Sequence, residues 1–526
     1  MTAEGRAVGR AMRRARPARR RRRSVAAERK PAIWLLAAGV VTFAISAAGL
    51  GLLFVSRPEL SFMIDLQVYV WGGRMARLAG SPYQGTGAPL NLSFTYPPIA
   101  AAAFELLSRI QLVVLKWLVS IASVVSLAVV IWLSWGKLGY RRSPGRVGAT
   151  LLVAAIVLWL EPIQQTLAFG QINVLLMLLI VADLCLPDRN RLKGVGVGLA
   201  AGVKLTPLIF IPYLLLTRRY RAAGVALGTF GMTIAASYLL LPKAAGQFWA
   251  GRLFLTVGRV GNAAYVGNES LYGAALRLFG SAGAARPYWL AAATVVGLAG
   301  LLLAAWLSRR DLELAGIVTC ALTGLLVSPV SWSHHWVWIA PILVALTELV
   351  VRAAKMVTLS PGLLAAWLAV AVAGMPVLAA LALYIAYPFH AAPGAPLLPA
   401  GLIWTVPSPA VQGSHMTGYQ QLIGSLYVLA GLIAVAVMAA WLLVPVLGRR
   451  VVQDRSGLVA AIWRLSPLRR HGLGRVSTPL TTAGSAAPPP PAPRSPSGLE
   501  EPGPLSRRRS VGLDLWNGSG HTDHQS

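Results

Sequence analysis

Cysteines and acidic residues are scarce in this sequence, and the motifs of soluble nucleotide-binding enzymes are missing from it. The two cysteines, Cys185 and Cys320, each lie within an apolar run, so neither a disulfide framework nor a cysteine-based metal site is expected. The sequence has no Walker A phosphate loop, no convincing GxGxxG fingerprint and no cluster with metal-ligand spacing. We therefore expect no cofactor and no resident metal.

Charge is also scarce: 12% of the residues are charged, against about 25% in a soluble globular protein. Hydrophobic residues make up 56% of the chain and recur in runs long enough to cross a bilayer. The fold class predicted is therefore an all-α polytopic membrane protein, and the first run, from Ala32, is interpreted as an anchor rather than a signal peptide. Spans are predicted near 32–56, 112–135, 148–163, 172–187, 222–241, 287–307, 312–328, 334–351, 361–386 and 420–446.

The net charge of +31 is concentrated at the ends of the chain and in short loops. Arg19–Arg23 are consecutive, and such basic clusters favour the cytoplasmic side. No nucleic-acid reader module accompanies them, so membrane lipids and not nucleic acid are the expected partners. Three parts are predicted: a basic cytoplasmic arm (1–31), a transmembrane catalytic domain (32–450), and a cytoplasmic tail (451–526) that is basic, then Pro-rich and disordered.

The segment 194–216 conflicts with a simple span. Were it to cross once, the basic residues at 218–221 would lie outside, against the positive-inside rule. Lys204, Pro207 and Pro212 interrupt its apolar pattern. We therefore expect a broken or re-entrant pair of short helices that returns to the cytoplasmic side. With that choice every strong basic cluster, and both termini, are predicted to be cytoplasmic.

A polar but patterned stretch follows the first span. Ile64, Val68, Trp71, Met75 and Leu78 recur at helical spacing and predict an amphipathic helix that ends at Gly80-Ser81-Pro82. A second helix is expected to begin at Tyr96-Pro97-Pro98, because proline suits a first turn. The two helices are predicted to lie on one membrane face.

Polar residues near the span ends gather on the predicted extracytoplasmic side, where a site is expected. Asp65 opens the amphipathic helix, either as a general base or only as a helix cap. His334 and His335 stand in a tryptophan-rich segment, as partners of a phosphate or only as interfacial residues. Adjacent residues on a helix point about 100° apart, so at most one of the two is expected in the site.

Two cations could bind a phosphate. Lys204 would do so as a point charge, although snorkelling to the cytoplasmic interface is slightly favoured for it. Arg277 would bind through two parallel hydrogen bonds, or else be an interfacial arginine. The other candidate substrate-binding residues are polar side chains near the same face: Tyr96, Gln171, Asn173 and Asn268.

Five segments together resemble glycosyltransferase family 87, a group of the GT-C superfamily. They are IDLQVYVWGGRMARLAGSPYQ with FTYPP, FGQINVLLMLL, GVGVGLAAGVKLTPLIFIPYLLLTRRYRA, GNESLYGAALR and SPVSWSHHWVW. Each motif alone is weak, but their order and spacing make the set fairly specific. The resemblance covers roughly residues 32–450.

The resemblance implies a GT-C fold with about 10–12 transmembrane segments and an extracytoplasmic active site. It implies a polyprenyl-phosphate mannose donor, a glycolipid or glycan acceptor, and α-1,2-mannosyl transfer with inversion. Asp65 occupies the place of the family's catalytic base, and His334 or His335 that of a histidine near the donor phosphate. A polyprenyl phosphate leaves readily, so inverting displacement requires one carboxylate rather than a close pair.

Three alternatives compete with this hypothesis. A secondary transporter or flippase would carry ionisable residues near the bilayer midplane and an inverted repeat, and neither is evident. A GT-C transferase of another sugar or acceptor is the more serious rival. A non-catalytic assembly protein is the third, and the presence of Asp65 argues weakly against it.

Overall fold

The computed structural model describes residues 32–86, 91–359, 364–390, 397–406 and 416–451. The basic arm and nearly all of the tail predicted from the sequence lie outside these residues. The N-terminal half of the described chain contains the helix Ala32–Ser56, η1 (Pro58–Ser61), α2 (Ile64–Ala79), α3 (Pro98–Leu107), α4 (Leu112–Lys137), α5 (Pro144–Val157), α6 (Glu161–Phe169), α7 (Asn173–Cys185), α8 (Val195–Val203), η2 (Thr206–Ile209), α9 (Phe210–Leu216) and α10 (Tyr220–Leu240).

The remaining elements begin with a run of short turns. They are α11 (Pro242–Ala245), η3 (Gly246–Ala250), η4 (Leu253–Leu255), η5 (Val257–Val260), α12 (Leu271–Phe279), α13 (Ala282–Arg309), α14 (Glu313–Val327), η6 (Ser333–Trp338), α15 (Ile339–Leu359), α16 (Leu364–Tyr384), β1 (Tyr387–His390), β2 (Leu397–Ala400), η7 (Leu402–Thr405), α18 (Gly418–Ile423) and α19 (Leu426–Val451).

The fold is that of an all-α polytopic membrane protein, as predicted. Among the described residues, six helices are long and apolar enough to cross a membrane, or seven if the bent pair α6–α7 is one span. Shorter apolar helices, including α5, α14 and the first part of α19, occupy other predicted span positions. Their buried faces join those of α4, α7 and η6 in one large apolar core.

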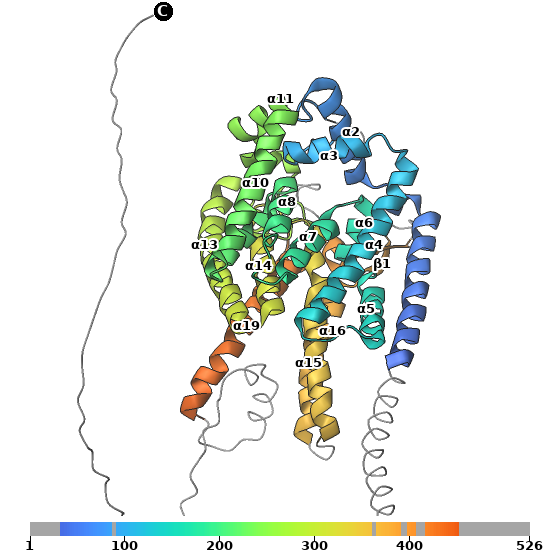
Figure 1. The fold of residues 1–526 in the computed structure, drawn as a ribbon, viewed down its shortest axis with the longest axis vertical. Coiled ribbons are helices and arrows are strands. Elements are labelled where there is room, and N and C mark those ends of the chain that lie inside the picture. The colour runs from blue at the N-terminus through green and yellow to red at the C-terminus, as the bar shows by residue number, and fades with distance from the viewer. Residues whose placement is uncertain (1–31, 87–90, 360–363, 391–396, 407–415, 452–526) are drawn as a thin grey trace, which may run out of the picture. The chain divides into compact units, whose positions relative to one another are not determined.

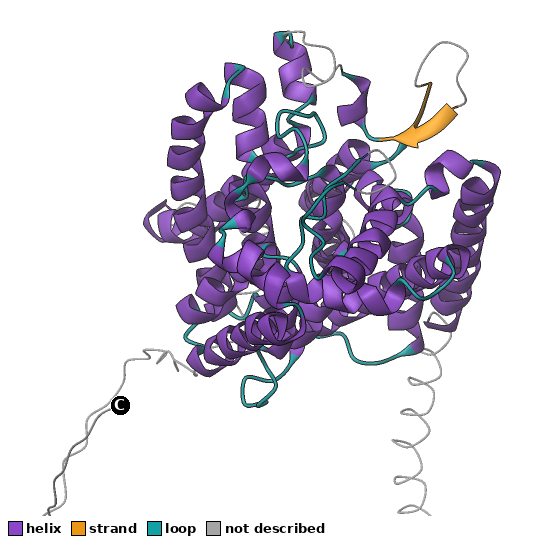
Figure 2. Ribbon diagram, turned by 90° about the horizontal axis from the view of Figure 1, so that it is seen from above, coloured by secondary structure: helices purple, strands orange, loops and turns teal. Residues whose placement is uncertain are grey.

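The sequence did not predict the hairpin β1–β2. Its strands pair antiparallel, with Tyr387 opposite Ala400, and Figure 2 shows it at the periphery of the helices. It lies in the stretch 387–419, for which only an extracytoplasmic loop was expected.

The segment 194–216 is broken, as predicted. Helix α8 ends at Val203, Lys204 has extended backbone (φ −147°, ψ 130°), and the chain resumes as η2 and α9. The start of α8 is fixed by Asp183, whose carboxylate accepts hydrogen bonds from the N–H groups of Gly194 (2.7 Å) and Val197 (2.9 Å). A carboxylate at a helix N-terminus satisfies otherwise unpaired N–H groups.

Helix α2 packs on α3, and Figure 1 shows both at the end of the molecule where α11 lies. The predicted helix is confirmed, ending at Gly80 with φ 68°. The predicted apolar stripe is buried only in part, because Val68 is 5% exposed and Leu78 is 67% exposed. The helix also turns Gly73 toward α3, so close that a Cβ there would lie 2.5 Å from a backbone atom of Phe104.

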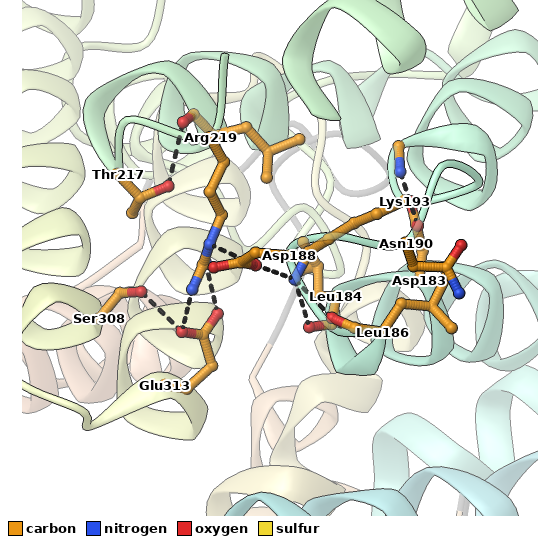
Figure 3. A network of polar contacts seen from close by, with 12 residues as sticks. Asp183, Leu184, Leu186, Asp188, Asn190, Lys193, Thr217, Arg219, Ser308 and Glu313 are labelled. Carbon is orange, nitrogen blue, oxygen red and sulfur yellow. Dashed lines mark hydrogen bonds and ion pairs between the residues drawn. The ribbon is translucent and has the colours of Figure 1, made fainter. Parts of the chain in front are cut away.

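A polar network joins the segments around α8–α10 to α14 (Figure 3). Arg219 donates two hydrogen bonds to the carboxylate of Glu313, at 2.7 and 2.6 Å, and its Nε lies 3.1 Å from Asp188. Lys193, only 1% exposed, donates to the same Asp188 at 2.7 Å. Because the Arg219–Glu313 pair is largely buried, losing one partner would leave an uncompensated charge.

Candidate active site

Asp65 lies in the first turn of α2, where the chain enters the helix through Met63 with φ 55°. The N-cap position is taken by Met63, and Asp65 is an acidic residue of the first turn. Asp65 Oδ2 accepts a hydrogen bond of 2.7 Å from Gln171 Nε2. The segment that carries Gln171 can approach α2 this closely because Gly170, at φ 67°, has no side chain. A Cβ at position 170 would lie 2.7 Å from the Cβ of Leu66. Met63 and not Asp65 thus occupies the N-cap, and the Asp65 carboxylate is directed to Gln171.

Gln171 links this carboxylate to two tyrosines. Gln171 Oε1 accepts hydrogen bonds from the hydroxyl groups of Tyr69 (2.7 Å) and Tyr96 (3.2 Å), which are 2.7 Å apart. A carboxylate only accepts hydrogen bonds, so the amide nitrogen must face Asp65 and the amide oxygen the tyrosines. The tyrosines thus fix the orientation in which Gln171 presents its N–H to Asp65.

Lys204, at the break after α8, points toward the same region. Its Nζ donates to Asn173 Oδ1 at 2.9 Å, lies 2.9 Å from His335 Nε2, and stands 5.7 Å from the centre of the Tyr96 ring. The slightly favoured snorkelling of Lys204 is therefore not found. A charged lysine has no acceptor, so beside it His335 Nε2 must accept and carry its proton on Nδ1.

The structure separates the roles of the two histidines, which the sequence left open. The His335 ring joins Lys204. His334 contributes its main-chain oxygen, which accepts hydrogen bonds from Asn173 Nδ2 (2.8 Å) and Thr166 Oγ1 (3.0 Å). Its own ring packs edge-on against Phe169, and its Nε2 has no hydrogen-bond partner in the described structure. The centres of the two imidazole rings lie 4.8 Å apart, and the ring of His335 contacts Lys204. The expectation that at most one of them belongs to the site stays a prediction.

The electrostatics suit Asp65 to proton transfer near neutral pH. Burial raises the pKa of Asp65 to about 6, opposed by the hydrogen bond from Gln171 and the positive charge of Lys204. A general base works best when its pKa lies near the operating pH. At pH 7 the carboxyl is therefore mostly ionised and still basic enough to accept a proton from a hydroxyl.

Two other predicted site residues, Arg277 and Asn268, lie in a different cluster. Arg277 donates to the main-chain oxygens of Tyr265 (3.2 Å) and Asn268 (2.9 Å) and to the Ser425 hydroxyl (3.1 Å). Asn268 holds the main chain of Ser331, accepting its N–H at 2.9 Å. Within the described contacts neither joins the network of Asp65, and their binding roles stay predictions.

Tyr69 is a member of the network that the sequence analysis did not single out. It follows Asp65 by four residues, so the two side chains share a helix face. That spacing was a usable signal, but Tyr69 also fits the apolar side of α2, where it stacks on Phe104 at 4.4 Å between ring centres. Among the described residues, no group of three or more His, Cys, Asp or Glu side chains is placed to hold a metal ion.

These features define a class: a multi-pass membrane protein in which the Asp65 carboxylate is hydrogen-bonded to Gln171, near a lysine–histidine pair. The model of glycosyltransferase family 87 matches residues 94–329. This range contains Tyr96, Gln171 and Lys204, whereas Asp65 and His335 lie outside it. No solved structure matches the chain.

Curated relatives extend the match. One, from Mycobacterium tuberculosis, is named a polyprenol-phosphate-mannose-dependent alpha-(1-2)-phosphatidylinositol mannoside mannosyltransferase, and is 36% identical over 301 residues, covering 53% of this chain and 69% of the relative. Another from that species, named for a phosphatidylinositol pentamannoside acceptor, is 36% identical (55% and 68% covered). A third, from Mycolicibacterium smegmatis, is 34% identical (56% and 72%). The chain belongs to glycosyltransferase family 87, which confirms the resemblance and the prediction of a membrane glycosyltransferase.

Proposed function

We propose that this protein transfers a mannosyl residue from a polyprenol-phosphate-mannose donor to a phosphatidylinositol mannoside or related glycan acceptor. The names of the relatives support the donor and the acceptor class. The observation that carries the mechanism is the contact between Asp65 and Gln171, in the network that also reaches Lys204 and His335. It supports a base and a phosphate site that are built together from distant parts of the chain.

In this mechanism Asp65 accepts the proton of the attacking acceptor hydroxyl. The hydroxyl oxygen bonds to the anomeric carbon while the bond to the donor phosphate breaks, and the electron pair leaves with the polyprenyl phosphate. Gln171 keeps one carboxylate oxygen in place through its 2.7 Å hydrogen bond, leaving the other oxygen for the proton. Attack opposite to the leaving group inverts the anomeric centre.

Lys204 and His335 are proposed to receive the leaving phosphate. An ammonium has three N–H groups, and Lys204 already directs two, to Asn173 and His335. The third can donate to a phosphate oxygen, and the positive charge stabilises the developing dianion. Because the Asn173 amide also binds the His334 main-chain oxygen, the lysine is held by a fixed partner.

The test is transfer of labelled polyprenol-phosphate mannose in membranes supplied with native lipid extract. We expect Asp65→Asn to lose activity by about 10²–10⁴-fold, the range for a general base. Asp311→Asn is the matched control, because Asp311 is exposed and its φ of 62° is one that asparagine tolerates. Equal activity of Asp65→Asn at equal expression would refute the assignment of the base.

We further propose that the site faces the extracytoplasmic side, which the predicted orientation of the basic loops supports. The test places single cysteines in exposed positions, Thr86 near α2 and Arg141 between α4 and α5, in a Cys-free background. A membrane-impermeant maleimide should label Thr86→Cys in intact cells and Arg141→Cys only after permeabilisation. The reverse pattern would place the site on the cytoplasmic side.

A further inference from the structure

A cradle of three aromatic rings lies outside the Asp65 network. Tyr265, Trp332 and Trp404 come from three separate segments and are each partly exposed. The ring centre of Tyr265 lies 6.3 Å from that of Trp332 and 5.7 Å from that of Trp404, with interplanar angles of 66° and 51°. The rings thus pack edge-on and tilted against one another, and each keeps part of its surface exposed.

Two buried glutamates lie next to this cradle. Glu161 accepts hydrogen bonds of 2.8 Å from Trp404 Nε1 and from the Tyr427 hydroxyl. Glu269 Oε2 accepts the N–H of Tyr427 at 3.2 Å. The segment that carries Tyr265 and Glu269 is bound to the one that carries Trp332 by a β-bridge between Asn268 and Trp332.

Several polar atoms of this region are buried and have no hydrogen-bond partner in the described structure. They are both amide atoms of Gln164, single oxygens of Glu269 and Ser331, and Nε of Arg277 (5%, 0%, 0% and 4% exposed). Gln164 follows Glu161 by three residues on α6, so the two share a helix face. Buried polar groups are nearly always paired, so each such atom needs an explanation.

We propose that the cradle is a carbohydrate subsite, which holds a pyranose ring of the acceptor that does not react. A pyranose presents apolar C–H faces, which pack on aromatic rings, and hydroxyl groups, which pair with carboxyl, amide and hydroxyl side chains. Its hydroxyl groups would pair with Glu161, Glu269, Gln164 and Ser331. This inference rests on the proposed function, because it assumes a glycan acceptor.

The carboxyl groups here suit sugar hydroxyls, because they can accept hydrogen bonds and, when protonated, donate them. The ionisable groups beside the rings are the carboxyls of Glu161 and Glu269, and Arg277 directs its guanidinium to two main-chain oxygens and the Ser425 hydroxyl. Burial raises the pKa of Glu269 to about 8, opposed by the charge of Arg277. The Glu269 carboxyl is thus mostly neutral at pH 7, and since Oε2 accepts N–H groups, Oε1 is free to donate to a sugar hydroxyl.

The cradle lies near the proposed reaction centre. The stretch Ser331–His335 contributes to both: Trp332 to the cradle and His335 to the contact with Lys204. Three residues of extended chain cover at most about 11 Å, which limits the separation of the two backbones. An acceptor ring in the cradle would therefore be linked to the reacting sugar directly or through a short glycan. The predicted roles of Asn268 and Arg277 become those of positioning residues, since both hold the main chain that carries the rings.

The first test separates acceptor binding from donor binding in steady-state kinetics. We expect Trp404→Ala to raise the acceptor KM about tenfold, a typical loss for a buried aromatic contact, with the donor KM unchanged. Trp404→Phe, which keeps a ring, should recover most of the affinity. Trp117→Ala is the matched control, because Trp117 lies on α4 and is 54% exposed. Equal loss of donor and acceptor affinity, together with a lower Tm for both Trp404 variants, would reduce Trp404 to a structural residue and overturn the subsite.

Gln164→Leu gives a sharper second test. Leucine removes the unpaired amide, so the variant should fold at least as stably as the wild type. If Gln164 binds a sugar hydroxyl, the acceptor KM rises although Tm does not fall. An unchanged acceptor KM would remove Gln164 from the subsite.

A direct binding measurement keeps this inference separate from the proposed function. Purified Asp65→Asn protein is titrated with a short α-mannoside while tryptophan fluorescence is recorded. We expect saturable binding that is weakened about tenfold by adding Trp404→Ala. Binding that is insensitive to Trp404→Ala overturns the cradle. Sensitive binding in a protein whose wild type transfers no mannose would instead refute the proposed function and leave the cradle standing.

Discussion

Replacing Asp65 by asparagine should abolish activity and at the same time stabilise the fold. A carboxyl group has a pKa of 3.8 when unperturbed, and burial raises that of Asp65 to about 6. The folded state therefore binds this proton more tightly than the unfolded state does. As the pH rises from about 4 to 6, the unfolded chain loses the proton first, and the folded protein is destabilised until both states are ionised.

The size of the effect follows from the shift. About two pH units between the two states correspond to about 3 kcal/mol at pH 7.5, at 1.36 kcal/mol per unit. About half of this cost is present at pH 5, because the unfolded state is by then ionised and the folded state is not. Asparagine carries no charge and can still accept the Gln171 N–H, so the variant avoids the cost and keeps the contact.

The assay is thermal unfolding of wild type and Asp65→Asn in the same detergent at pH 5 and pH 7.5. We expect the variant to have the higher Tm, with a larger difference at pH 7.5, and transfer activity of the wild type to fall below pH 6. A Tm difference that is absent, or that shrinks as the pH rises, would show that ionising Asp65 does not destabilise the folded protein, and would refute the raised pKa. Asp311→Asn, at an exposed position, is the control for removing a carboxylate as such.

Three further outcomes are expected. Lys204→Met should move the acidic limb of the kcat/KM profile to higher pH, because the charge of Lys204 lowers the pKa of Asp65, the proposed base; an unmoved limb would contradict their coupling. Arg219→Met should destabilise the protein by about 3–5 kcal/mol by leaving Glu313 buried without its cation, and adding Glu313→Leu should recover much of that loss in Tm. Gly73→Ala should cost about 1–3 kcal/mol through its clash with the α3 backbone, whereas Gly228→Ala, with open space around it, should leave Tm unchanged or raised.

Composition and periodicity predicted the helices well because long apolar runs have few alternatives in a bilayer. The break at Lys204 was also predicted, since a lysine and two prolines interrupt an apolar run. The close contact of α2 with α3 was not, because it depends on Gly73. A glycine carries no hydrophobic signal, and only the close approach of α3 shows why it lies inward.

The candidate site illustrates a different limit. Asp65, Gln171, Lys204 and one of the two histidines were candidates from local chemistry, although snorkelling was slightly favoured for Lys204. The structure groups Asp65 with Gln171 and Lys204 with His335, and the Tyr96 ring lies between the two pairs. Pairing could not be predicted, because the partners are separated by 106 and 131 residues along the chain. Tyr69 was missed since a buried tyrosine on an amphipathic helix has the same pattern whether its hydroxyl is used or not.

The stretch Ser331–His335 contributes side chains both to the aromatic cradle and to the contact with Lys204, which suggests why it is rich in polar and aromatic residues. It alternates partners: Ser331 and Trp332 lie with the cradle, while His335 meets Lys204. A displacement of this stretch would thus move the proposed acceptor subsite and the proposed phosphate site together. Asn268 and Asn173 hold it from both sides, through the N–H of Ser331 and the carbonyl of His334. Asn268→Ala should therefore weaken acceptor and donor binding together, unlike Trp404→Ala, and an effect on the acceptor alone would show that the two sites move independently.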